Sequence, residues 1–314
     1  MLVNLVPEFL ACLAAPDPFA AYREYLDRHK PVLSGYWHNY VLDPASPHAE
    51  QVIAAALRAD RTDLEDLLDD VDVVALADEA LMASTERLEA DCPVDLYLTV
   101  GVGAANAGEL VVGGRGIAFV CLEHFTGRAN AQSYGMGLSP RLLPPWIAHE
   151  VAHVVRYTSP TSRADMRRLV ADLGSYYDCW ETGSRATLRE LLVNEGVAVA
   201  AAQAVAPGFD PWEYCGYTRR QYRRLRELDA FLRRAVTPDL AATGLGFRLR
   251  FLSGGTSPAA RLVAGKVLPE RSGYYLGLRL VENYLAERGI ASTVRASARE
   301  LQDADDRALG IQTA

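Results

Sequence analysis

The hydrophobic and polar positions of the chain follow two different periods. Across residues 19–90 the apolar positions recur every three or four residues with charged residues between them, which is typical of amphipathic helices. Across residues 94–100 apolar and polar positions alternate, as in a strand with one buried face. Two apolar runs follow at residues 110–112 and 117–122, separated by glycines. The pattern predicts helices followed by a small sheet, and the short connections favour antiparallel pairing.

The second half of the chain has the helical period almost throughout, with linkers rich in Gly, Ser and Pro. The expected helices cover residues 144–157, 164–173, 186–204, 217–235, 273–287 and 297–309. These elements predict an α+β fold. We expect an N-terminal lobe of helices and a small sheet at residues 1–143, and a helical lobe at residues 144–314.

Composition and charge exclude several classes of protein. The 314 residues are 50% hydrophobic and 23% charged, which is ordinary for a globular chain. A net charge of -8 argues against nucleic-acid or anionic-membrane partners. No apolar stretch approaches the roughly 18 residues of a membrane span, and the first residues lack the basic segment of a secretory signal. We therefore expect a cytoplasmic protein. Its five scattered cysteines contain no CxxC pair and predict neither a disulfide framework nor a thiolate zinc site.

The segment His149-Glu150-Val151-Ala152-His153 is an HExxH motif, and it lies in a stretch that is predicted to be helical on its apolar pattern alone. A spacing of four places both imidazoles on one helix face, about one turn apart, where they can share a zinc ion. Glu150 can then reach a water molecule on that metal. His149 and His153 are thus the predicted zinc ligands, and Glu150 is the predicted general base.

A third protein ligand has to come from elsewhere. An HExxHxxGxxH pattern would need glycine and histidine where this chain has Arg156 and Ser159, so that arrangement is excluded. The helix predicted at residues 186–204 offers Glu190 and Glu195. Glu195 precedes a run of Gly and Ala that would let its helix press closely against the HExxH helix, whereas Glu190 points to a different face. We predict Glu195 as the third ligand; the alternative is an alanine-rich core helix with an incidental glutamate.

The motifs in this order resemble a bacterial family of predicted zinc-dependent proteases of the gluzincin type. That family commonly shows HEYHH, then EGLA, then PxRxGYxxG; this chain has HEVAH, EGVA at residues 195–198 and PERSGYYLG at residues 269–277. The similarity covers about residues 144–285. Val151, Ala152 and Val197 depart from the family pattern, and none of them is a ligand. The resemblance implies a zincin-like fold and a zinc-dependent peptidase, without naming the substrate.

The resemblance also places Arg271 and Tyr274 near the metal, where either side chain can stabilise an oxyanion. Tyr274 is the preferred donor, although the sequence does not separate it from Tyr275, and both can be aromatic residues of an ordinary helix. By analogy with zincins, the strand at residues 117–123 is expected to be the edge strand that pairs with an extended substrate.

These observations predict one catalytic unit formed by both lobes. A peptide or protein substrate would be cut by zinc-activated water, with Glu150 as the base and His149, His153 and Glu195 as zinc ligands. Two alternatives stay open: a non-catalytic zincin-like domain that binds a peptide or protein, and a zinc-dependent hydrolase of a non-peptide amide. The substrate, the choice between exo- and endopeptidase, and the oligomeric state are not determined by the sequence.

Overall fold

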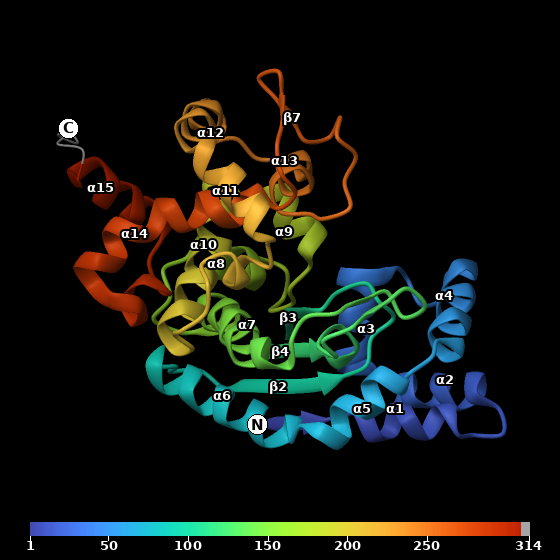
Figure 1. The fold of residues 1–314 in the computed structure, drawn as a ribbon. Coiled ribbons are helices and arrows are strands. Elements are labelled where there is room, and N and C mark those ends of the chain that lie inside the picture. Colours follow the sequence, from blue (N-terminus) through green and yellow to red (C-terminus); the bar gives the residue numbers. More distant parts are fainter. Residues whose placement is uncertain (309–314) are drawn as a thin grey trace.

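A four-stranded mixed sheet lies in the N-terminal half of the computed structural model, which describes residues 1–308 (Figure 1). Its strands, in spatial order, are β1 (Leu2–Asn4), β2 (Val94–Thr99), β4 (Arg115–Cys121) and β3 (Ala107–Val112). The pairs β1–β2 and β2–β4 are parallel, and the pair β3–β4 is antiparallel.

The expectation of an antiparallel sheet is therefore wrong for two of the three strand pairs. Short connections exclude parallel neighbours only when a crossover helix has to return the chain, and here β3 itself returns the chain. After β2 the chain passes to the sheet edge, runs back as β3 and turns sharply into β4. Gly113 and Gly114 make this two-residue turn with φ values of 58° and 80°, which suit glycine in a tight hairpin. The short N-terminal strand β1 was not predicted.

Helices fill the sequence between β1 and β2, as the periodicity of residues 19–90 predicts. Side chains of Asp17 and Asp72 cap two of them by accepting hydrogen bonds from backbone N–H groups of the first turn. The helices of this half are α1 (Val6–Leu13), α2 (Pro18–Arg28), α3 (Lys30–Tyr36), α4 (Pro47–Arg58), α5 (Thr62–Asp70) and α6 (Val73–Arg87).

The second half is helical, so the predicted α+β class and the distribution of its elements are confirmed. The segment predicted as one helix at residues 217–235 is divided at Leu228, and two short helices, α9 and α13, were not predicted. None of the helices within residues 1–308 has the length and apolar content that a membrane span requires. The helices are α7 (Leu143–Thr158), α8 (Asp165–Asp172), α9 (Cys179–Arg185), α10 (Leu188–Val205), α11 (Arg219–Glu227), α12 (Asp229–Val236), α13 (Leu245–Phe251), α14 (Ser272–Thr293) and α15 (Ala298–Ala308).

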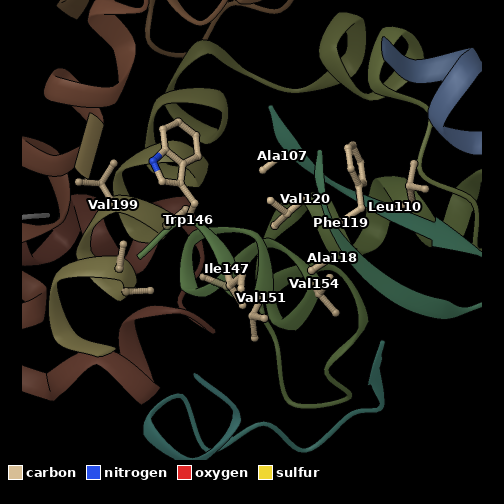
Figure 2. Close-up of a cluster of buried hydrophobic side chains, with 14 of the residues drawn as sticks. Ala107, Leu110, Ala118, Phe119, Val120, Trp146, Ile147, Val151, Val154 and Val199 are labelled. Atoms are coloured by element: carbon tan, nitrogen blue, oxygen red, sulfur yellow. The ribbon is translucent and has the colours of Figure 1, made fainter. Parts of the chain in front are cut away.

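Helix α7, which carries the HExxH motif, lies between the sheet and the helices of the second half (Figure 1). Figure 2 shows Ile147, Val151 and Val154 of this helix within one apolar cluster with Ala118 and Val120 of β4. The other side of α7 packs against α10. Because α7 contacts elements of both halves, it fixes the motif relative to each; the lobe boundary at residue 143 itself stays a prediction.

Helices α10 and α14 meet backbone against backbone at two glycines. A Cβ atom on Gly277 would lie 1.8 Å from the carbonyl oxygen of Leu192, and one on Gly196 would lie 2.0 Å from the carbonyl carbon of Gly277. Helix α10 does pack against the HExxH helix, as expected, but the close backbone approach at Gly196 is to α14. Its consequence is that the start of α14 stands beside the same helix that carries Glu195.

We expect Gly277→Ala to lower the free energy of unfolding by about 3 kcal/mol, because the added methyl group meets rigid backbone and forces the helices apart. Gly246→Ala is the matched control: Gly246 also lies in a helix, α13, and a Cβ there would meet nothing within 4 Å. That control is expected to be neutral or slightly stabilising. Urea unfolding of both variants measures the difference, and equal stabilities would contradict the close helix contact.

Candidate metal centre

Three side-chain atoms of the predicted ligands form a small triangle between α7 and α10. The two Nε2 atoms of His149 and His153 are 3.2 Å apart, and the Oε2 atom of Glu195 is 3.4 Å from the first and 3.6 Å from the second. Tetrahedral ligands at zinc bond lengths of roughly 2.0–2.1 Å are about 3.3 Å from one another. The structure thus brings together the three residues that the sequence singles out, at separations that suit zinc.

Unpartnered atoms in this buried space also fit a bound cation. All three residues are buried, and Oε2 of Glu195 has no donor in hydrogen-bonding geometry among the described residues. A buried carboxylate oxygen without a partner is costly, and a cation at the centre of the triangle would satisfy it. The residues present therefore fit the zinc ion that the motif implies.

The charges of the cluster favour a positive charge at the same place. Burial lowers the pKa of His153, but the carboxylates of Glu109 and Glu195 outweigh burial and raise it to about 9. Burial raises the pKa of Glu195, and His153 with His149 outweighs that effect and holds the pKa well below its usual value. Without metal, the nearby carboxylates thus favour a protonated, positively charged imidazole at His153. A metal ion would supply positive charge at the same place.

Glu109 of β3 belongs to this cluster and was missed by the sequence analysis. Ligand atoms of Glu109, Glu150 and His153 lie within 4.8 Å of one another. The hydroxyl group of Tyr40 donates a hydrogen bond of 2.9 Å to one carboxylate oxygen of Glu109, and that of Tyr157 donates one of 3.0 Å to the other. The sequence offered one signal for Glu109: it is the charged residue of an otherwise apolar strand. A buried acid needs partners, so its position there indicates a polar cluster.

Glu150 faces the same space from α7. Its side chain is buried and makes no hydrogen bond within the described part of the chain. Burial raises the pKa of its carboxyl group well above the usual value, and the negative charge of Glu109 raises it further. A carboxyl group with these surroundings holds a proton more strongly than an exposed glutamate does.

The two adjacent tyrosines of α14 point in different directions. The ring of Tyr274 stacks on the imidazole of His149, with 5.9 Å between ring centroids and an angle of 17° between the planes. The hydroxyl group of Tyr275 instead donates a hydrogen bond of 2.9 Å to Asp229 on α12. The structure therefore places Tyr274 beside the predicted metal ligands and Tyr275 away from them.

Arg271 supports the ring of Tyr274. Its guanidinium group lies over that ring at 5.4 Å and donates a hydrogen bond of 2.7 Å to the carbonyl oxygen of Gly216. Its backbone is left-handed, with φ 53°, and its own carbonyl oxygen accepts a hydrogen bond from the hydroxyl group of Tyr217. Arg271 thus fixes the start of α14 and the orientation of Tyr274.

Glu190 has a different environment from Glu195. Its Oε1 atom accepts a hydrogen bond of 2.9 Å from Arg156, and both side chains are fully buried. Arg156 also donates to Asn194 and to the carbonyl oxygens of Val294 and Ala296. This ion pair ties α7 to α10 and to the end of α14, so Glu190 serves packing.

The prediction that the strand at residues 117–123 is an edge strand is wrong, because β4 lies between β2 and β3. The edge strand on that side is β3. At Glu109 the backbone N–H group of this edge donates to the hydroxyl oxygen of Tyr40, and the carbonyl oxygen of Val111 accepts from the N–H group of Tyr177. The β3 edge is therefore bonded to the protein itself at these positions.

Comparison with known protein families adds one match. The model of a family described as "Predicted Zn-dependent protease (DUF2268)" matches residues 176–303. The resemblance to predicted zinc-dependent proteases is confirmed over these residues. The matched part contains Glu195 and the segment at residues 269–277, while the HExxH helix precedes it. No curated protein and no solved structure matches the chain.

We expect the purified protein to bind a single zinc ion, and Glu195→Gln to weaken binding by more than the about 10- to 100-fold that is typical of losing a supporting group. Glu190→Gln should retain zinc but lower the free energy of unfolding by about 3 kcal/mol, because Arg156 loses its buried partner. Chelator competition and urea unfolding measure the two effects. The assignment of Glu195 is wrong if the two variants exchange these outcomes.

Proposed function

We propose that this protein is a zinc metallopeptidase that hydrolyses a peptide bond. The observation that carries the proposal is the triangle of His149, His153 and Glu195, with the carboxyl group of Glu150 on the same buried side of α7. The description of the family that matches residues 176–303 supports the same activity. His149, His153 and Glu195 would hold the ion and leave a fourth position open.

Zinc, when bound there, would lower the pKa of water and polarise a peptide carbonyl group. Glu150 would accept the proton of the attacking water and later deliver it to the leaving nitrogen atom. The raised pKa of Glu150 suits both halves of this transfer, because burial and the charge of Glu109 both favour its protonated form. Glu109 itself is held by the two tyrosine hydroxyl groups and acts as a fixed negative charge.

Tyr274 would donate its hydroxyl hydrogen to the oxygen atom on which negative charge develops during attack. Burial, followed by the charge of Glu195, raises the pKa of Tyr274 well above its usual value, so the hydroxyl group stays protonated and able to donate. Arg271 would act as a positioning residue, since its guanidinium group covers the ring of Tyr274.

Glu150→Gln is expected to retain zinc and stability but to lower kcat/KM by about 10²- to 10⁴-fold, because an amide does not accept the proton. Glu79→Gln, on the exposed face of α6, is the control and should match the wild type. A peptide library that is digested under zinc-replete conditions and read by mass spectrometry provides the substrate. Equal cleavage by Glu150→Gln, or no cleavage by the wild type, would favour a binding domain over an enzyme.

For Tyr274→Phe we expect kcat to fall by roughly 10²- to 10³-fold with KM and zinc content near the wild-type values, as for loss of one oxyanion donor. Tyr275→Phe removes only the bond to Asp229, so its effect should be a loss of about 1 kcal/mol in stability. Steady-state kinetics with a peptide that the wild type cleaves in the library digest measures kcat and KM for both variants. A kcat within about threefold of the wild type for Tyr274→Phe would remove this role.

A further inference from the structure

Arg248 on α13 is a cation without an anionic partner. It is half-buried, and within the described side chains it takes part in no ion pair and no hydrogen bond. None of its nitrogen atoms is among the sealed, unpartnered polar atoms of the structure, so its donors remain accessible. A half-buried guanidinium group with free, accessible donors is suited to binding an anion from outside the protein.

Packing of α13 places this helix against α9 and beside the start of α14, which carries Tyr274. The stem of Arg248 lies on Gly183 of α9, where a Cβ atom would come within 2.7 Å of its Cδ atom. The end of α13 lies on Gly273, where a Cβ atom would be 2.9 Å from the carbonyl oxygen of Phe251. Gly273 directly precedes Tyr274, so α13 spans from α9 to the turn of α14 that faces the predicted ligands.

The electrostatics of Arg248 point in the same direction. Burial lowers its pKa, but Tyr177, Cys179 and then Glu109 and Glu195 outweigh burial and raise it. Arg248 in turn is one of the cations that lower the pKa of Tyr274 against its burial. The charges of Glu109 and Glu195 therefore act on the guanidinium group of Arg248, although it forms no ion pair with either of them. A bound zinc ion would offset those carboxylates and leave the charge of Arg248 without compensation.

We infer that Arg248 binds a carboxylate group of the substrate close to the bond that is cut. The inference rests on the proposed function and specifies its substrate class: peptides with a carboxylate beside the scissile bond. A guanidinium group matches a carboxylate with two parallel hydrogen bonds, which gives both affinity and register. The carboxylate is either the C-terminus of the peptide or an Asp or Glu side chain, and both present the same chemistry to Arg248.

The test compares peptides that differ only in this charge. From a peptide that the protein cleaves, one pair has a free or amidated C-terminus, and a second pair has Glu or Gln beside the cleaved bond. The wild type should prefer the carboxylate member of one pair by about 10- to 100-fold in kcat/KM. Arg248→Gln should bring this ratio close to one, and Arg248→Lys should retain part of it. The responding pair identifies the source of the carboxylate.

Arg250→Gln is the matched control, since Arg250 lies on the same helix and donates to the carbonyl oxygen of Ala260. It should keep the wild-type ratio. Arg248→Gln overturns the inference if it slows both members of a pair by the same factor, because Arg248 then serves the fold or the reaction in general. Equal cleavage of carboxylate and amide peptides by the wild type also overturns the inference. This comparison needs no variant, so it stays decisive even if Arg248→Gln does not fold.

A binding measurement separates this inference from the proposed activity. Dissociation constants of fluorescent versions of the same peptides are measured on zinc-loaded Glu150→Gln, with and without Arg248→Gln. A carboxylate preference that depends on Arg248, together with no cleavage by the wild type, supports the inference and refutes peptide hydrolysis. Cleavage that depends on Glu150 but shows no preference for the carboxylate peptide supports hydrolysis and overturns the inference. The same conclusion follows if such cleavage occurs and no peptide of either pair binds measurably.

Discussion

Negative charge in a buried space is the constraint on which the rest of this structure depends. Glu109, Glu150 and Glu195 converge on two imidazoles between β3, α7 and α10, and the fold has to keep these carboxylates from destabilising it. It does so in two ways. Two tyrosine hydroxyl groups hold Glu109, whereas Glu195 is balanced chiefly by the imidazoles, and the pKa of His153 is raised in turn. Among the described residues, no fixed hydrogen bond offsets the charge of Glu195 as the tyrosines offset that of Glu109. A metal ion would offset it instead.

The surrounding helices can bring such groups together because they are held at fixed distances. Gly196 and Gly277 bring α10 and α14 into backbone contact, so Glu195 and Tyr274 belong to two helices that cannot separate without breaking that contact. The buried pair of Arg156 and Glu190 links α7 to α10 from the other end of the cluster. Close packing and a buried ion pair thus set the geometry of the cluster from opposite sides, and loss of either would loosen the same triangle.

Most of the candidate site was predictable because its members lie at fixed spacings along single helices. His149, Glu150 and His153 share one turn of α7, and Glu195 precedes a glycine that marks a helix contact, although the sequence did not show that the partner is α14. Glu109 was not predictable, since only the fold brings β3 beside α7. The strand order was missed for a related reason: the apolar run at residues 110–112 predicts a strand there, but not that this strand returns the chain to the edge of the sheet.

Within residues 1–308, two groups of residues have the donor types for a metal, and their hydrogen bonds favour one of them. Glu109, Glu150 and His153 form one group, and His149, His153 and Glu195 form the other. Both oxygens of Glu109 already accept hydrogen bonds from tyrosines, so binding a metal there would cost those bonds. Oxygen Oε2 of Glu195 has no such bond to lose. His153 belongs to both groups and can serve only one ion, so zinc held at Glu195, as proposed above, would leave Glu109 bonded to its two tyrosines beside Glu150.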